Sequence, residues 1–360
     1  MPNIVPHSPS MRIPGVRPAG DAAAGARLRY CWRMILITGG AGFIGSNVAA
    51  SLCERGERVA VCDRLRQGAK WRNVAKLPLR ELIAPERLLE WLPTQAAGID
   101  TLVHLGAITS TTETDADLIV DVNFRLSQAL WRWCTREGKR FIYASSAATY
   151  GAGEQGFDDD PAPQALAQLR PLNAYGWSKH LFDRWVVQQL QEGTARPPQW
   201  VGLKFFNVYG PNEYHKGGMR SVVAQKYPLA AGNAAVTLFR SHRAGVPDGG
   251  QQRDFIYVRD CVEVLTWLLD HSQVNGLFNL GTGQARRFEE LARALWAALD
   301  REAHIEYVEM PLALRAQYQY FTQASMERLR QAGYTRPFTS LEEGVRDYVQ
   351  RYLSQADPYR

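Results

Sequence analysis

Three polar side chains in the middle of the chain have the types and spacing of an acid/base site. Tyr175 and Lys179 are four residues apart in AYGWSK, so on a helix they share one face. A nearby ammonium stabilises a phenolate and lowers the pKa of the tyrosine, which suits Tyr175 as a general acid/base. Ser146 ends the apolar stretch RFIYASS, where a hydroxyl is able to bond a substrate oxygen and align proton transfer. Ser145 is equally suited to capping the following turn.

A glycine-rich turn near the start of the chain is typical of a dinucleotide site. ITGGAGFIGSN places Gly39, Gly42 and Gly45 between an apolar run and an amphipathic stretch. Gly39 permits a tight turn, Gly42 lets the backbone approach a pyrophosphate, and Gly45 lets a helix pack on the strand. The helix N-terminus then offers free N–H groups and a positive dipole end to phosphate. Asp63, eighteen residues after Gly45, completes the dinucleotide-binding pattern.

The residues around Asp63 leave the choice of dinucleotide open. Asp63 would accept hydrogen bonds from an adenosine ribose hydroxyl, which favours NAD. Arg64, Arg66 and Lys70 follow directly and are able to hold a 2′-phosphate, which favours NADP. A solvated loop explains these basic residues equally well.

Alternating strands and helices must position these residues. Short apolar runs predict strands at 34–39, 58–63, 100–107, 140–151 and 200–210, and amphipathic stretches predict helices at 43–55, 115–137 and 175–191. This alternation predicts an α/β fold, a Rossmann-type doubly wound parallel sheet. After about Asn207 the pattern changes to a loop-like segment at 240–254, strands at 255–260, 276–283 and 304–310, and helices.

We therefore expect three parts in the chain. Residues 1–33, rich in Pro, Gly, Ala and Arg, are expected to form a disordered extension, and Met34 is an alternative translation start. Residues 34–206 form an NADP-binding Rossmann domain to which 255–285 returns. A smaller C-terminal α/β substrate-binding domain comprises 207–254 and 286–360.

Composition excludes several classes of function. The 360 residues carry a net charge of +6, but the first 33 hold five arginines and one aspartate, so the rest is nearly neutral and no nucleic-acid partner is expected. No apolar run approaches the roughly 20 residues of a membrane span. The five scattered cysteines indicate reduced thiols in the cytoplasm, and the seven histidines have no metal-binding spacing, so we expect no metal.

Several stretches resemble the extended short-chain dehydrogenase/reductases, the group of nucleotide-sugar epimerases and dehydratases. The glycine turn, YGWSK, RDFIYVRD and NLGTG are found throughout that family, and STTETD, YGPNEYHKG and YQYFTQA resemble its ADP-glyceromanno-heptose 6-epimerases. The resemblance runs from Met34 to about Tyr352. It implies a cytoplasmic isomerase that transiently oxidises C6 of ADP-heptose with bound NADP, for the lipopolysaccharide inner core. It also implies a homo-oligomer, described for the family as a pentamer.

The resemblance further implies a role for each site residue. Tyr175 and Lys216 are the two acid/base residues, one for each face of the sugar, and Ser146 and Lys179 complete the catalytic set. Besides Tyr175, Lys179 and Lys216, the cofactor site comprises Gly39, Gly42, Phe43, Ile44, Gly45, Asp63, Arg64, Lys70, Leu105, Gly106, Ala107, Ile108, Thr109, Asn123 and Val208. The substrate site comprises Ser146, Asn207, Gly218, Gln225, Phe239, Arg240, Ser241, His242, Arg253 and Tyr318. Lys70, retained from the family, favours NADP over NAD.

Lys216 admits two interpretations. Inversion of a centre needs proton transfer in two orientations, which one tyrosine does not easily serve, and a lysine in a desolvated site has a lowered pKa. The alternative is a point-charge contact to a substrate phosphate. Arg253 suits the diphosphate because its planar fork bridges two oxygens.

Alternative functions stay open at this point. A sugar dehydratase would place an acidic residue beside Ser146, where Ala147 stands. A UDP-hexose 4-epimerase would not explain Lys216, and a non-catalytic NADP-binding module would have no need of an acid/base pair. Gly218, Gln225 and the long loop 240–252 depart from the best-known family members on the substrate side, so the exact nucleotide sugar is open.

Overall fold

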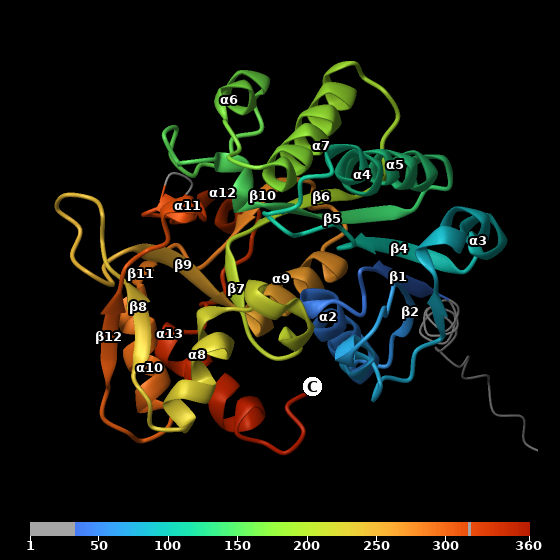
Figure 1. The fold of residues 1–360 in the computed structure, drawn as a ribbon. Coiled ribbons are helices and arrows are strands. Elements are labelled where there is room, and N and C mark those ends of the chain that lie inside the picture. The colour runs from blue at the N-terminus through green and yellow to red at the C-terminus, as the bar shows by residue number, and fades with distance from the viewer. Residues whose placement is uncertain (1–32, 316–317) are drawn as a thin grey trace, which may run out of the picture. The chain divides into compact units, whose positions relative to one another are not determined.

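Seven parallel strands form the central sheet of this computed structural model, which describes residues 33–315 and 318–360 (Figure 1). The expected extension over 1–33 lies outside the described residues except for Arg33. In spatial order the strands are β10 (Gly276–Leu280), β6 (Trp200–Phe205), β5 (Arg140–Ser146), β4 (Ile99–His104), β1 (Met34–Thr38), β2 (Arg58–Cys62) and β3 (Glu81–Ile83). The predicted α/β fold with a Rossmann-type parallel sheet is confirmed.

Helices cover both faces of this sheet because its strands are apolar on both sides. In β1, Ile35 and Ile37 pack into one core with α2 (Phe43–Glu54) and α9 (Val258–Asp270). Met34 and Leu36 pack into another core with α3 (Leu88–Gln95), α5 (Leu126–Arg136) and α7 (Ala174–Gln191). Figure 1 shows α4 (Ala116–Ile119), α5 and α7 above the central strands, and α2 and α9 below them.

A smaller mixed sheet and a parallel pair of strands follow in the C-terminal half. One has the order β11 (Ala285–Arg287), β9 (Gln252–Tyr257), β7 (Asn207–Tyr209), and the other pairs β12 (Ile305–Val308) with β8 (Val236–Phe239). They share a core with α8 (Val222–Ala231), α10 (Phe288–Ala297) and α13 (Leu341–Tyr348). β10 then pairs with β6, so the chain returns to the central sheet between β9 and β11.

Three predicted elements end differently in the structure. The strand expected over 200–210 is broken at Phe206, because β6 belongs to the central sheet and β7 to a smaller one. The strand expected over 255–260 ends at Tyr257, where α9 begins, and the strand expected over 140–151 ends at Ser146, which caps a 3₁₀ helix. The helix expected over 115–137 contains a π-helical stretch between α4 and α5.

The remaining elements are short. They are η1 (Ala69–Asn73), η2 (Pro85–Arg87), η3 (Val120–Arg125), η4 (Ala147–Tyr150), α6 (Pro163–Gln168), η5 (Tyr214–Met219), α11 (Leu312–Arg315), α12 (Glu327–Gln331) and η6 (Val349–Leu353). Within the part of the chain that the structure describes, none of the helices has the length and apolar character needed to span a membrane.

Candidate active site

The glycine turn between β1 and α2 is packed from two sides and open on the third. Gly39 has a φ of +68°, and a Cβ there would lie 2.6 Å from the backbone nitrogen of Gly106. A Cβ on Gly45 would overlap the carbonyl oxygen of Gly39. A Cβ on Gly42 would meet only the backbone of Gly39, at 3.0 Å from its oxygen, so the space beyond Gly42 is free for a ligand.

The first turn of α2 faces this space. Its N-cap, Gly42, provides no side-chain cap, and the turn carries no acidic residue. The backbone N–H groups of Phe43 and Ile44 therefore have no partner within the helix and point where a phosphate would be bound. This arrangement fits the pyrophosphate of a dinucleotide.

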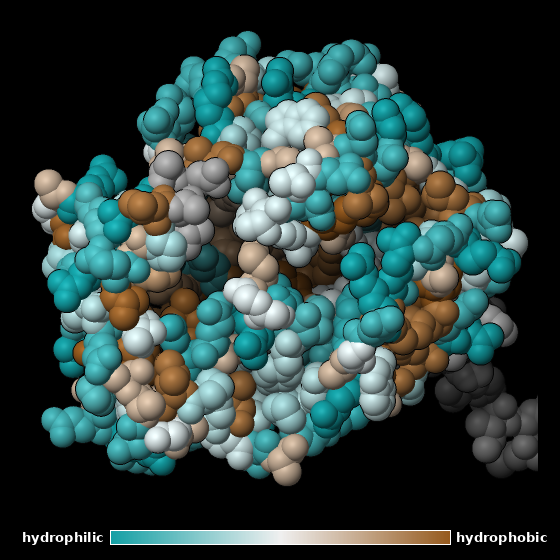
Figure 2. All heavy atoms as spheres, in the orientation of Figure 1, coloured by the Kyte–Doolittle hydropathy of each residue, from teal (hydrophilic) through white to brown (hydrophobic). Residues whose placement is uncertain are grey.

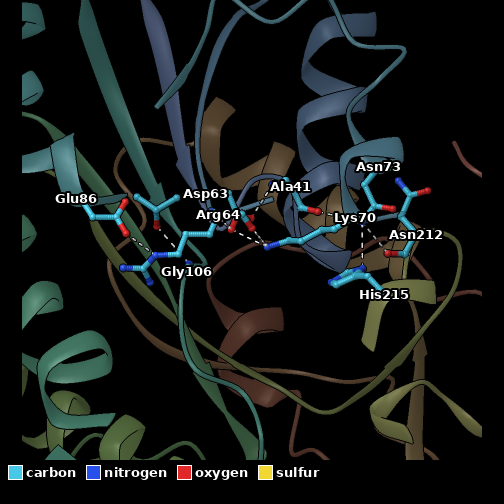
Figure 3. Close-up of polar contacts among 10 residues, drawn as sticks. Ala41, Asp63, Arg64, Lys70, Asn73, Glu86, Gly106, Asn212 and His215 are labelled. Carbon is cyan, nitrogen blue, oxygen red and sulfur yellow. Dashed lines mark hydrogen bonds and ion pairs between the residues drawn. The ribbon is translucent and has the colours of Figure 1, made fainter. Parts of the chain in front are cut away.

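Asp63 at the end of β2 is the centre of a polar group beside the turn (Figure 3). Its carboxylate accepts hydrogen bonds from the N–H of Ala41 at 3.0 Å, from the N–H of Arg64 at 2.7 Å and from Lys70 Nζ at 2.6 Å. Arg64 Nε donates to Glu86 at 2.6 Å. The structure thus brings Asp63 together with Arg64 and Lys70, two of the three basic residues expected near a 2′-phosphate.

The segment after β4, which contains the predicted residues Leu105, Gly106, Ala107, Ile108 and Thr109, forms another wall of the site. The N–H of Gly106 donates to Thr38 Oγ1 at 3.2 Å, and the backbone of Ile108 exchanges two hydrogen bonds with the Asn123 side chain, at 2.8 and 3.0 Å. Asn123 Nδ2 also donates to Ser178 Oγ at 3.0 Å. This wall is therefore fastened to α7.

Helix α7 presents Tyr175 and Lys179 on one face. Asn173 caps the helix, with Oδ1 accepting from the N–H of Gly176 at 2.8 Å, and so fixes where the two residues fall. Hydrogen bonding by the hydroxyl of Ser146 favours the ionised form of the Tyr175 phenol. The expected lowering of the Tyr175 pKa is wrong for this structure, because burial raises that pKa and the Ser146 hydrogen bond only partly opposes it.

Two buried charges behind this face were missed by the sequence analysis. Lys204 Nζ lies 2.8 Å from Asp183 Oδ2, and both side chains are fully buried. Asp183 also accepts a hydrogen bond from Ser145 Oγ at 2.6 Å. Burial lowers the pKa of Lys179 to about 8, against the opposing charge of Asp183. The signal was available, since Asp183 follows Lys179 by one further helical turn.

Lys216 reaches the same site from η5. Its Nζ lies 5.3 Å from the centre of the Phe43 ring, at the first turn of α2. Burial lowers the pKa of Lys216, as expected, and the buried Glu213 opposes that shift. Glu213 accepts from the N–H and the hydroxyl of Ser221, each at 2.5 Å, and from Tyr348 Oη at 3.1 Å. These bonds hold the loop that carries Lys216 to the start of α8 and to α13.

The predicted substrate residues fall into groups. Arg253 is 7% exposed and lies 5.2 Å from the Tyr318 ring, which in turn contacts Phe239 at 6.2 Å between ring centres. Gln225 Nε2 donates to the carbonyl of Gly218 at 3.1 Å. Arg240, Ser241 and His242 lie on the loop beside Asp248 and Glu309, and Asn207 accepts from Thr322 Oγ1.

Figure 2 shows a deep hollow in the middle of the face over β7. Half-buried Val208 lies on that strand and packs against the cores of both the central and the smaller sheets. In the described residues no group of His, Cys, Asp and Glu side chains is arranged to bind a metal.

Known proteins are similar to this chain in sequence and fold. Residues 35–281 match the model of the NAD dependent epimerase/dehydratase family. The ADP-L-glycero-D-manno-heptose-6-epimerase of Fusobacterium nucleatum is 46% identical over 335 residues, covering 91% of this chain and 100% of the relative. The crystal structure of the Helicobacter pylori protein of that name is 30% identical, with a TM-score of 0.71, over 88% of this chain and 95% of its own. The crystal structure of a Thermus thermophilus UDP-glucose 4-epimerase complex with NAD is 27% identical, with a TM-score of 0.70. The match covers 90% of this chain and 100% of that one.

Proposed function

Because this chain belongs to the NAD dependent epimerase/dehydratase family, and within it to the ADP-L-glycero-D-manno-heptose-6-epimerases, we propose that it inverts C6 of ADP-heptose by transient oxidation with bound NADP. One observation carries this proposal. Two side chains able to transfer protons come to this site from different parts of the chain. Tyr175 on α7 interacts with Ser146 at the end of β5, and Lys216 in η5 lies over the ring of Phe43 in the first turn of α2.

The glycine turn, the uncapped start of α2 and Asp63 would hold the dinucleotide, and their geometry fits it, since a side chain at Gly39 or Gly45 would displace the turn. When bound, the dinucleotide supplies the acceptor and donor of the C6 hydride. We assign it as NADP because Lys70 and Arg64 lie at Asp63, where a 2′-phosphate would need positive charge.

The residues of the chain move the protons. On one face of the sugar, Lys216 takes the proton of the C6 hydroxyl as C6 becomes a ketone, a role favoured by its lowered pKa. After the ketone has turned, Tyr175 donates a proton to the same oxygen as C6 is reduced from the other face. Burial keeps Tyr175 protonated for this step, and Ser146 aligns it. The reverse reaction exchanges the two roles.

The sugar nucleotide would be held by the smaller sheets. Arg253, buried against the rings of Tyr318 and Phe288, offers a desolvated guanidinium for the diphosphate. We therefore propose that 207–254 and 286–360 form the substrate-binding part of the enzyme, and that 34–206 and 255–285 form the cofactor-binding part.

A proton NMR time course of ADP-D-glycero-D-manno-heptose with the purified enzyme tests the proposal. Growth of the L-glycero epimer with no net release of NADPH is the expected result. No change with this sugar but conversion of a UDP-hexose would retain the fold and replace the substrate. Inertness toward both would contradict the assignment as an epimerase.

A further inference from the structure

The carboxamide of Asn73 lies where the cofactor site meets the loop of Lys216 (Figure 3). Asn73 is 1% exposed, and its Nδ2 donates to the carbonyl of Ala41 at 2.9 Å, to the carbonyl of Asn212 at 3.0 Å and to His215 Nδ1 at 3.2 Å. Among the described residues its Oδ1 is buried without a hydrogen-bond partner. Asn73 therefore acts there as a donor, with three acceptors sharing two hydrogens.

The first of these acceptors belongs to the glycine turn. Ala41 donates its N–H to Asp63, and its carbonyl accepts from Asn73. Both backbone polar groups of Ala41 are therefore hydrogen-bonded to side chains. Asn73 is also the last residue of η1, the 3₁₀ helix that carries Lys70, and Lys70 is bonded to Asp63. Asp63 and Lys70 are thus connected to Asn73 both through Ala41 and through η1.

The other two acceptors belong to the loop that ends in Lys216. Asn212 additionally donates from Nδ2 to Ser46 Oγ in α2, at 3.0 Å, which holds the same loop to the phosphate-binding helix. His215 is the neighbour of Lys216 in η5. A hydrogen bond from Asn73 to Nδ1 requires the neutral imidazole of His215 with its proton on Nε2. Burial and the charges of Lys70 and Lys216 also favour the neutral form, whereas the charge of Asp63 opposes it. The net effect lowers the pKa of His215 to about 4.

We propose that Asn73 is a positioning residue for Lys216: its amide fastens the Lys216 loop to the glycine turn and to the helix of Lys70, so that cofactor binding and the placement of the second acid/base are coupled. This inference rests on the proposed function, in which Lys216 transfers a proton. In this role Asn73 acts only through Lys216.

Two variants of Asn73 test this role in the NMR assay. Asn73→Ala removes the side chain, and Asn73→Asp removes the N–H donor while keeping the size of the side chain. We expect kcat to fall by about 10²-fold, as for a misplaced catalytic group. In a Lys216→Met background the same changes are expected to lower the residual rate much less, because they act through Lys216. An equal loss in both backgrounds, or wild-type turnover, would overturn the role.

A second pair of variants tests the bond if the Asn73 variants do not fold. His215→Leu removes the acceptor, whereas His215→Asn keeps an acceptor atom near the position of Nδ1, so the second variant is expected to recover most of the kcat lost by the first. Equal rates for the two would contradict the proposal.

Trp71→Ala is the matched control, since Trp71 lies on the same 3₁₀ helix and is 53% exposed, and it is expected to turn over as the wild type does. An inactive wild type would refute the proposed function and this inference together. An active wild type with active Asn73 variants would refute this inference alone.

Discussion

The hydroxyl of Ser146 favours the ionised form of the Tyr175 phenol, and the same Oγ accepts a hydrogen bond from the N–H of Ala148 at 3.1 Å. The backbone of η4 therefore fixes the serine, and the serine orients the phenol. Tyr175→Phe keeps the ring and removes the proton. We expect kcat to fall by about 10²–10⁴-fold, the usual contribution of a positioned acid/base, with cofactor affinity nearly unchanged.

Lys216→Met is the matched change at the second proposed acid/base residue and is expected to have a similar effect on kcat. NMR time courses and titration of the cofactor by fluorescence measure both variants. Near-normal turnover in either one would contradict the assignment of two acid/base residues.

Glu213→Gln tests the electrostatics of Lys216. A carboxylate favours the ammonium form, so Glu213 raises the pKa of Lys216 while burial lowers it. Glutamine keeps an oxygen for Ser221 and removes the charge, and the pKa of Lys216 is then expected to fall further. The limb of the kcat–pH profile that reports Lys216 should move to lower pH. A shift to higher pH, or none, would mean that Glu213 does not act on Lys216.

The main features of the fold follow from local patterns in the sequence. The apolar run at the start of Met34–Thr38 and the helical spacing of Val48 and Leu52 are sufficient to predict a buried parallel strand and its covering helix. The break at Phe206 was missed because local apolarity is continuous there, and only the tertiary structure separates β6 from β7.

The polar contacts behind the site depend on residues far apart in the chain. Asn73 and His215 are separated by 142 positions, and Lys204 and Thr149 by 55, so no motif predicts their contacts. The direction of the Tyr175 pKa shift was predicted wrongly for a related reason. Its direction depends on burial, which the spacing of Tyr175 and Lys179 does not reveal.

His104 links protein stability to pH. Its ring is 1% exposed, with Nδ1 2.6 Å from Thr38 Oγ1 and Nε2 2.9 Å from Ser127 Oγ. Because Ser127 donates its own proton to the carbonyl of Asn123, it accepts from Nε2–H, and the neutral imidazole is fully bonded. Burial accordingly lowers the pKa of His104 from 6.5 to about 3.

The sign of the resulting pH dependence follows from that shift. Between pH 6.5 and about 3 the unfolded chain binds the proton and the folded protein does not, so His104 makes the free energy of unfolding decrease as pH falls, by up to about 1.4 kcal/mol per unit. Asp159 and Asp260, whose pKa values burial raises to about 6, act in the opposite sense. Urea denaturation at about pH 7 and about pH 5 measures this contribution. On going from about pH 7 to about pH 5, the free energy of unfolding of His104→Gln should fall less, or rise more, than that of the wild type. Equal differences would exclude this role of His104.

The buried pair of Lys204 and Asp183 predicts an asymmetric mutational response. Lys204→Met leaves the Asp183 carboxylate buried without its counter-charge, and we expect a loss of about 3–5 kcal/mol in the free energy of unfolding. Adding Asp183→Leu removes the uncompensated charge and should recover part of that loss. Arg87→Ala, which breaks an exposed ion pair with Glu90, is the control and should change stability by less than about 0.5 kcal/mol. A double variant less stable than Lys204→Met would contradict the explanation.

We expect Lys70 to favour the binding of NADP over NAD. Its ammonium lies 2.6 Å from Asp63 Oδ1 and 3.0 Å from the carbonyl of Arg64, at the point where the adenosine ribose would be bound. Lys70→Met removes the charge that would face a 2′-phosphate but leaves Asp63 free to accept from a ribose hydroxyl. We expect the dissociation constant for NADP to rise about ten-fold or more, since a charge-assisted contact contributes about 1.5–3 kcal/mol.

The dissociation constant for NAD separates a phosphate contact from general damage to the site, because NAD lacks the 2′-phosphate. It is expected to stay unchanged or to fall, since Lys70 no longer competes for Asp63. Arg87→Ala supplies the control for a lost surface charge nearby in the chain. Equal weakening of both dinucleotides would mean that Lys70 supports the turn through Asp63 and does not read the phosphate. Tighter binding of NAD than of NADP by the wild type would overturn the choice of cofactor itself.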